Sequence, residues 1–328
     1  MISARMTANL SPRARRALVT VCTMTATIMQ ALDTTVANVA LPYMQGSLSA
    51  SLDQINWVLT SYIVAAAIMT APMGWMADRY GRKRVFVTAA AGFTVASLLC
   101  ALSQNIESIV LARLMQGMFG AALVPLSQSV MLDSYPPEQR GQAMAIWGVG
   151  VMLGPIMGPT IGGYLTENYS WHWVFLINLP VGVITVLGLL VFLEETKRQS
   201  HLRFDWFGFA ALAIGIGALQ LMLDRGEQAG WFESPEIIAE LIVAIAGFYY
   251  FFAHSLTTDE PFVRFEVFKD ANFLAGCLFM VVVGVGLFGT MALVTPFTQY
   301  MLGYPIQTAG YVLGARGVGT LCAMIVVS

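Results

Sequence analysis

Stretches of about 20 consecutive apolar residues follow one another along almost the whole of this 328-residue chain. An α-helix of that length spans the roughly 30 Å hydrocarbon core of a bilayer, because each residue adds about 1.5 Å. The stretches are apolar throughout, whereas membrane β-strands alternate over about ten residues. We place them at residues 17–41, 55–77, 85–103, 106–132, 141–165, 172–193, 205–223, 236–256, 271–293 and 306–328. The sequence therefore predicts an all-α integral membrane protein with about ten membrane helices.

The low charge of the chain argues against a soluble domain. Only 11% of the residues are charged, against about 25% in soluble domains, 57% are hydrophobic, and the mean hydropathy is +0.69. A net charge of −2 gives no indication of a nucleic-acid partner. The cysteines all fall within apolar stretches, which is typical of small packing residues rather than of a disulfide or metal framework. They are Cys22, Cys100, Cys277 and Cys322.

Basic residues gather on one side of the predicted membrane and thereby orient the helices. All but three of the seventeen lie before the first apolar stretch or in the loops after the second, fourth, sixth and eighth. Since Lys and Arg are enriched in cytoplasmic loops, we predict a multi-pass protein of the cell inner membrane with a cytoplasmic N-terminus. A cleaved signal peptide is the alternative for the first forty residues, but the later charge bias requires the first helix to stay in place. The three exceptions are Arg113, Arg225 and Arg316.

Two charged residues lie within predicted membrane helices. Asp33 belongs to the first apolar stretch, where a charge costs about 2.5–3.5 kcal/mol on insertion scales, so it is expected to face a partner or a water-filled cavity. Arg113, in the fourth stretch, keeps its proton and must be paired or hydrated. Asp33 is therefore the first candidate for proton or substrate binding.

Asp33 and Arg113 are expected at similar depths in the membrane. Asp33 lies about eight residues from the outer end of the first helix, and Arg113 lies about seven residues, roughly 10 Å, into the fourth. If these helices flank one cavity, the two side chains can approach directly or through water. Protonation of Asp33 would then free the arginine to rearrange. A static structural salt bridge is the alternative.

A loop rich in glycine and arginine follows the second predicted helix. Glycine permits tight turns, and an aspartate at a helix end can accept from the free N–H groups of a neighbouring helix. A positive-inside loop explains the basic residues but not the spacing of the others. Asp133, at the end of the fourth helix, is a candidate ion-pair partner for Arg79 or Arg82, and a solvated interfacial carboxylate is the alternative. The loop positions are Gly74, Asp78, Arg79, Gly81, Arg82 and Lys83.

Small residues recur at every fourth position of the fifth predicted helix. They form one smooth stripe on which another helix can pack closely, and two prolines bend the helix by removing backbone donors. Dimerisation through the stripe is the alternative. The residues are Gly150, Gly154, Pro155, Gly158, Pro159, Gly162 and Gly163.

These motifs resemble the major facilitator superfamily. The loop from Gly74 to Arg84 matches its G-x-L-A-D-R-x-G-R-K/R signature except for Met76 in place of leucine, and Arg113-Leu114-Met115-Gln116-Gly117 matches its R-x-x-Q-G motif of the fourth helix. The glycine and proline run looks like the antiporter motif of drug exporters. Further runs, from Leu32, Trp57, Trp171 and Leu219, look like the fourteen-helix drug:proton antiporters, and within them the EmrB-type subunits of tripartite multidrug pumps.

The resemblance implies how the chain is divided. A six-helix bundle is expected at residues 17–195 after a cytoplasmic segment 1–16, two linker helices at 196–260, and the incomplete start of a second bundle at 261–328. Four of fourteen helices would be missing, so we expect a fragment of a longer protein that does not transport alone, since alternating access needs both bundles.

The resemblance also implies proton-coupled export of hydrophobic drugs or toxic compounds, and hence antibiotic resistance, by alternating access. Asp33 and Arg113 would couple the proton, the loop would gate, and a periplasmic adaptor and outer-membrane channel would carry substrate onward. No cofactor beyond the proton gradient is expected, and no G-x-x-x-x-G-K-[ST] nucleotide loop is visible. The expected ligands are hydrophobic small molecules, protons and membrane lipid. Candidates for the substrate cavity are Met29, Gln30, Thr34, Asn38, Tyr62 and Gln116.

Other functions remain open. A transporter of the same fold could export a physiological metabolite, a siderophore or a lipid. A membrane-embedded enzyme or sensor should show a metal cluster or a nucleophile with a base, but His172, His201 and His254 lie at loops or helix ends without ligand spacing. A channel is disfavoured by the gating and antiporter motifs.

Overall fold

The structure is a computed structural model that describes residues 11–196, 198–199, 201, 203–290, 293–294, 297–304, 312 and 319. The described residues form helices and connecting loops without a β-strand, as the sequence predicts. The chain divides into two compact units, Met1–Ser200 with Gly310–Ser328, and His201–Ala309. The predicted domain boundaries stay predictions.

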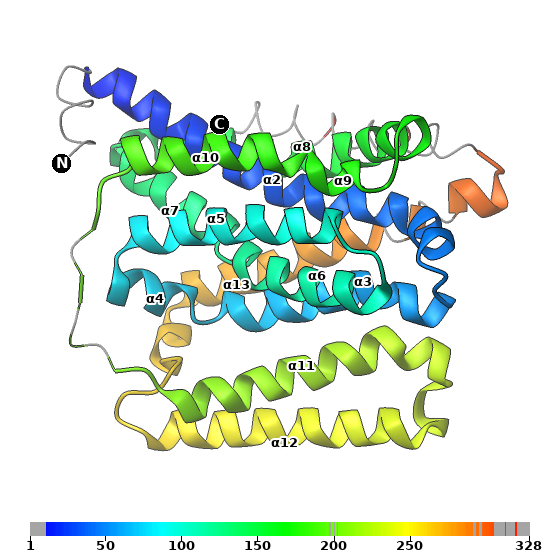
Figure 1. Ribbon diagram of the computed structural model, residues 1–328. Helices are drawn as coiled ribbons and strands as arrows, with labels where there is room; N and C mark the ends of the chain where they lie inside the picture. The colour runs from blue at the N-terminus through cyan, green and yellow to red at the C-terminus, as the bar shows by residue number, and fades with distance from the viewer. Residues whose placement is uncertain are drawn as a thin grey trace. The chain divides into compact units, whose positions relative to one another are not determined.

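The first unit is a bundle of long helices whose axes run nearly parallel or antiparallel (Figure 1). Ser51 and Asn105 start two of them with reciprocal capping boxes, which satisfy free N–H groups of the first turn. The helices are α2 (Pro12–Ser47), α3 (Leu52–Thr70), α4 (Met73–Tyr80), α5 (Arg82–Ala101), α6 (Ile106–Gly120), α7 (Leu123–Ser134), the short η1 (Pro137–Gln139), α8 (Arg140–Asn168), α9 (Trp173–Leu176) and α10 (Asn178–Phe192).

Three of the predicted membrane helices are interrupted. The second is split into α3 and α4, which meet at a 54° bend next to Pro72. Proline has no N–H to donate, so it favours such a break. The fourth is divided into α6 and α7, and the sixth into α9 and α10. The segments Ile106–Ser134 and Trp173–Phe192 are each still long and apolar enough to cross a membrane, as predicted for 106–132 and 172–193, and the bent pair α3 and α4 covers the predicted crossing at 55–77.

The glycine stripe of α8 packs on α2 within the same chain. A Cβ atom at Gly154 would overlap the backbone of Ala31, and one at Gly158 would overlap the Thr35 side chain. The Thr35 hydroxyl also donates to the Gly154 carbonyl at 3.1 Å. The stripe therefore brings α8 close to the helix that carries Asp33. Dimerisation, the alternative role considered for the stripe, would instead need its glycines to contact a second chain.

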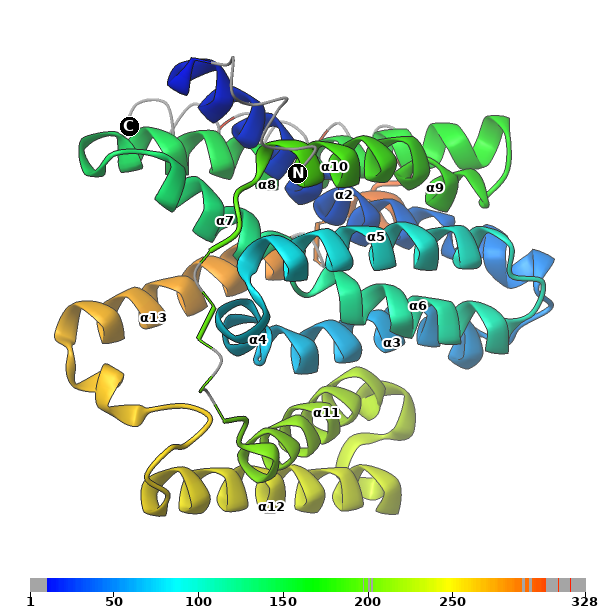
Figure 2. The same cartoon turned by 60° about the vertical axis from the view of Figure 1, so that its left-hand side comes forward.

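The second unit contains a helical hairpin, α11 (Trp206–Ala229) and α12 (Pro235–Thr257), which lie side by side in both views (Figure 2). A 3₁₀ turn, η2 (Trp231–Glu233), joins them. Ion pairs from Arg225 to Glu236 and Glu240 link the two helices near this turn. After a second 3₁₀ segment, η3 (Phe265–Lys269), the chain forms α13 (Ala271–Gly284) and the π-helical turns Val285–Gly289 and Phe297–Met301.

The described residues contain seven helical segments long and apolar enough to cross a membrane, or eight if the bent pair α3 and α4 counts as one span. Of the ninth predicted helix, 271–293, the structure describes the apolar α13 of 14 residues and the π-helical turn Val285–Gly289 that continues it. Residues 291 and 292 lie outside the described residues, so this crossing stays a prediction. The tenth predicted helix, 306–328, lies outside the described residues apart from 312 and 319.

Candidate functional site

Asp33 and Arg113 form a direct ion pair in the middle of the first unit. Nη1 of Arg113 lies 2.7 Å from Oδ2 of Asp33, and each residue is 1% exposed. Asp33 belongs to α2 and Arg113 to α6, and the sequence predicted that these two residues lie at similar depths in the membrane. The two charges thus satisfy each other in a site closed to solvent.

Two amide side chains bind the other oxygen of Asp33. Nε2 of Gln116 and Nδ2 of Asn178 each donate to Oδ1 at 2.8 Å. Both amides are buried, Gln116 on α6 and Asn178 at the start of α10. Gln116 also accepts from Nη1 of Arg113 at 2.8 Å, so it bridges the ion pair. The carboxylate therefore accepts three hydrogen bonds from two helices besides its own.

The guanidinium of Arg113 is held in place from a third helix. Its Nε donates to the backbone carbonyl of Val58 on α3 at 3.0 Å. Its Cζ lies 4.2 Å from the centroid of the Tyr62 ring and 5.7 Å from that of Phe175, distances at which a cation is attracted to an aromatic face. The Tyr62 hydroxyl in turn accepts from Nε2 of Gln30 at 3.2 Å.

A relay of hydrogen bonds extends from Asn178 towards α5 and α9. Nδ2 of Asn178 also donates to the Ser97 hydroxyl at 3.0 Å, and this hydroxyl donates to the Phe175 carbonyl at 2.9 Å. Cys100, also on α5, donates its thiol to Oε1 of Gln116 at 3.5 Å. Sequence reasoning placed none of Asn178, Ser97 or Cys100 in the site. The one available signal was a carboxamide, Asn178, inside an apolar run.

The substrate-cavity candidates fall into two groups. Tyr62 and Gln116 are buried and belong to the cluster around Arg113, and Met29 is buried in the bundle core. The remaining candidates are Gln30, Thr34 and Asn38, which recur at every fourth position of α2 and range from half-buried to exposed. Gln30 reaches the cluster around Arg113 through the Tyr62 hydroxyl, while Thr34 and Asn38 bond backbone carbonyls of α2 itself.

The segment from Gly74 to Arg84, expected from the resemblance to gate and called the gating loop below, forms one end of the first unit. Of the two arginines predicted as possible partners of Asp133, it is Arg82 that forms an ion pair with this residue of α7. Arg79 lies in the last turn of α4, and the ammonium of Lys83 donates to the Leu190 carbonyl at 2.7 Å. The contact that the structure gives Asp78 runs through its backbone carbonyl, which accepts from the Gln199 N–H at 2.9 Å.

The segment after α10 caps the helix that follows the gating loop. The Lys83 N–H donates to Oε1 of Glu195 at 3.2 Å, and the Arg82 N–H donates to the Thr196 hydroxyl at 3.1 Å. Gly81 has a φ of +97°, and a Cβ atom there would overlap the Glu195 carboxylate. Glu195 rather than Asp78 thus meets the N–H groups of α5. Neither Glu195 nor Thr196 was expected in the site.

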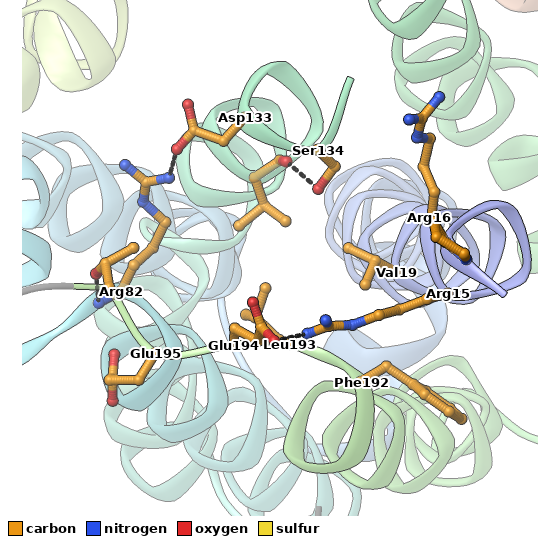
Figure 3. Close-up of a pocket in the computed structure, with 13 residues that line it drawn as sticks. Arg15, Arg16, Val19, Arg82, Asp133, Ser134, Phe192, Leu193, Glu194 and Glu195 are labelled. Carbon is orange, nitrogen blue, oxygen red and sulfur yellow. Dashed lines mark hydrogen bonds and ion pairs between the residues drawn. The ribbon is translucent and has the colours of Figure 1, made fainter. Parts of the chain in front are cut away.

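A charged cavity of about 500 Å³ opens beside these contacts (Figure 3). Arg15 at the start of α2 pairs with Glu194 across it, and the pair of Arg82 with Asp133 lies at another side. Arg16 donates to Gln139 at 2.9 Å. The basic start of α2, the gating loop and the end of α7 therefore meet at the same end of the bundle.

A second, apolar groove of about 350 Å³ lies between α4, α5 and the joint of α6 with α7. Methionines are prominent in its lining, and their flexible thioethers fill irregular gaps and adapt to different apolar surfaces. Tyr80 and Arg84 add polar groups to the lining. The methionines are Met69, Met73, Met76 and Met118.

Comparisons with known proteins agree with this architecture. A family model described as Major Facilitator Superfamily matches residues 23–328. The multidrug export protein EmrB of Escherichia coli (strain K12) is 40% identical over 307 residues, which cover 93% of this chain and 60% of the relative. The fatty acid resistance protein FarB of Neisseria gonorrhoeae is 40% identical over 297 residues, 90% of this chain and 58% of the relative. The chain therefore spans about three fifths of the length of these relatives.

Solved structures share the fold. The human organic anion transporter MFSD10 (TETRAN) superposes with a TM-score of 0.58 at 17% identity, over 94% of this chain and 71% of that one. The peptide transporter POT in complex with sulfate gives a TM-score of 0.54 at 18% identity, over 76% of this chain and 57% of that one. At these identities the likeness concerns the fold alone.

Proposed function

The chain belongs to the major facilitator superfamily, and we propose that it serves in proton-coupled export of hydrophobic drugs or other toxic compounds. The observation that carries the proposal is the buried cluster of Asp33, Arg113, Gln116 and Asn178. Buried ionisable residues are costly in a membrane protein and commonly mark the path of protons or ions. The relatedness to EmrB supports drugs as the cargo.

Asp33 is the proton carrier in this proposal. In its ionised form it balances Arg113, an attraction of about 4 kcal/mol for charges 4 Å apart at an effective dielectric constant near 20. A proton that binds Asp33 removes this attraction, while Arg113 keeps its charge and must find water or another acceptor. The contact between α2 and α6 then weakens, which gives the bundle a reason to rearrange when the proton arrives.

The proton gradient supplies enough energy for export. A proton that moves down 100 mV releases about 2.3 kcal/mol, and one pH unit adds about 1.36 kcal/mol. With one proton per neutral substrate molecule, the sum supports roughly 400-fold accumulation on the far side. The proposed exporter therefore needs no nucleotide.

The orientation proposed for the membrane is a cytoplasmic N-terminus in the inner membrane. Basic side chains from separate segments, Arg15, Arg16 and Arg82, gather around one cavity at one end of the first unit. Positive residues favour the cytoplasmic side, so this clustering supports placing that end inside. A periplasmic adaptor and an outer-membrane channel are proposed as partners on the resemblance to EmrB-type pumps.

Export of fatty acids or similar amphiphiles is the second candidate. FarB, which like EmrB is 40% identical to this chain, is named for fatty acid resistance. The methionine-rich groove offers apolar surface for an acyl chain, and Arg84 adds a cation to its lining. Competition between a fatty acid and a cationic drug in the same transport assay distinguishes the two cargo classes.

The proposal is tested by proton release from inverted membrane vesicles on addition of drug. The assay uses this chain within a transporter of the full length of its relatives. Asp33→Asn should abolish drug-induced proton release without loss of membrane insertion, while Asp53→Asn, a change at an exposed aspartate of α3, should leave it intact. Proton release by Asp33→Asn equal to that of the parent would remove Asp33 from the mechanism.

A further inference from the structure

Asn178 joins the proton site to two helices outside the ion pair. Its Nδ2 donates both to Oδ1 of Asp33 at 2.8 Å and to the Ser97 hydroxyl at 3.0 Å. We propose that Asn178 is a positioning residue of the proton site, whose carboxamide donates to ionised Asp33 and turns over to accept from protonated Asp33. The inference rests on the proposed function in that Asp33 is taken as the proton carrier.

The hydrogen bonds of Asp33 suit the ionised carboxylate. Oδ1 accepts from Gln116 and Asn178, and Oδ2 accepts from Arg113. An ionised carboxylate only accepts, whereas a carboxylic acid carries an O–H that needs an acceptor of its own. When a proton binds, at least one of these donors must therefore move away or exchange its N–H for an acceptor.

Asn178 is the donor best able to make this exchange. Arg113 has no acceptor atom to offer. Oε1 of Gln116 accepts hydrogen bonds from Nη1 of Arg113 and from the Cys100 thiol. Turning the Gln116 amide over would break both contacts. The carboxamide of Asn178 can turn over and present Oδ1 to the acid proton in place of Nδ2.

Ser97 allows the turned amide to keep a partner. Its hydroxyl now accepts from Asn178 and donates to the Phe175 carbonyl at 2.9 Å. A hydroxyl both donates and accepts, so it can redirect its hydrogen towards Oδ1 of the turned amide. Protonation of Asp33 would thereby release the Phe175 carbonyl from this hydrogen bond.

The hydrogen bonds from Asp33 through Asn178 and Ser97 end at the boundary between α9 and α10, the two parts of the sixth predicted helix. Asn178 is the first residue of α10, and Phe175 belongs to the one-turn helix α9 just before it. A change in the hydrogen bonds of both residues therefore acts on the joint between α9 and α10. In this way the charge state of a residue on α2 biases the junction of two other helices.

Infrared spectroscopy of the purified protein at a series of pH values tests the proposal. The readout is the amide C=O band of Asn178, assigned as the band that disappears in Asn178→Leu. Because the turned amide accepts from the acid O–H, this band should move to lower frequency when Asp33 is protonated, and it should not move in Asp33→Asn. In Ser97→Ala, where the turned amide lacks its second donor, the shift should be smaller.

The control and the second variant keep the test decisive. Asn168 is an exposed asparagine whose amide donates to the Tyr164 carbonyl of its own helix, so Asn168→Ala should leave the shift of the Asn178 band unchanged. An Asn178 band that stays in place when Asp33 is protonated, or that moves equally in Asp33→Asn, would overturn the proposal. If Asn178→Leu does not fold, the reduced shift in Ser97→Ala alone decides. The measurement needs no transport, so its outcome is independent of the vesicle assay of the proposed function.

Discussion

Nη1 of Arg113 on α6 lies 2.7 Å from Oδ2 of Asp33 on α2, although 80 residues of chain separate them. A buried ion pair is weak support for stability, because the cost of removing two charges from water can exceed their mutual attraction. Removal of one partner alone is much worse, since it leaves an unpaired charge. Stability and coupling can therefore be separated by substitution at these two positions.

Removal of both charges should be tolerated better than removal of one. Asp33→Asn leaves the Arg113 cation buried, at a cost of about 3–5 kcal/mol, and Arg113→Gln leaves the Asp33 carboxylate buried at a similar cost. The double variant should be more stable than either single variant, yet inactive in proton exchange. Thermal unfolding of all four proteins in one detergent checks the stabilities. A double variant whose loss equals the sum of the single losses would show that the pair is not coupled.

Arg113→Lys should fail although it keeps the positive charge. The guanidinium donates Nε to Val58 and Nη1 to both Asp33 and Gln116, and it lies over the Tyr62 ring. An ammonium is a compact charge without this planar fork, so it cannot make all of these contacts at once. We expect at least a tenfold loss of exchange, corresponding to about 1.4 kcal/mol. Vesicle assays at matched expression measure it, and exchange within twofold of the parent would contradict the expectation.

The charged half of the site was accessible from sequence because charge in a membrane helix carries a large cost. Asp33 and Arg113 interrupt long apolar runs, and the fixed rise per residue of a helix placed them at equal depth. Asn178 and Ser97 left almost no signal, since an amide or hydroxyl in an apolar run is less costly and is common in helix packing. Their role appears only when the fold brings α5 and α10 next to α2.

Helices were easier to predict than their interruptions. Apolar length predicts where a helix exists but not where it is interrupted, and of the breaks after α3, α6 and α9 the first lies next to a proline, Pro72. Similarly, the spacing of Gly150, Gly154, Gly158 and Gly162 indicated a close helix contact without identifying the partner. The stripe packs on α2, and only the tertiary structure identifies this partner.

Two glycines of the gating motif should respond differently to alanine. Gly81 has a φ of +97° and lies against the Glu195 carboxylate, so Gly81→Ala imposes both a strained backbone and an overlap, at a cost of about 1–3 kcal/mol. Gly74 is helical with open space around it, so Gly74→Ala should be neutral or stabilise by up to about 1 kcal/mol. Melting temperatures of the two variants measure the difference. Equal melting temperatures would show that Gly81 is not constrained by Glu195.

The glycine stripe of α8 should be sensitive to alanine at one position and tolerant at another. A Cβ atom at Gly154 meets the backbone of Ala31 on α2, which cannot move without separating the helices, so Gly154→Ala should cost about 1–3 kcal/mol. At Gly150 the same atom meets the end of the Met24 side chain, which can change rotamer, so Gly150→Ala should cost less than about 1 kcal/mol. Both variants gain the same helix propensity, so the difference in their melting temperatures isolates the contact between α2 and α8. Because Asp33 follows Ala31 by two residues, Gly154→Ala should also weaken proton exchange, whereas Gly150→Ala should not. A Gly150→Ala variant as unstable as Gly154→Ala would mean that the whole stripe, and not the approach at Ala31, sets the distance between the helices.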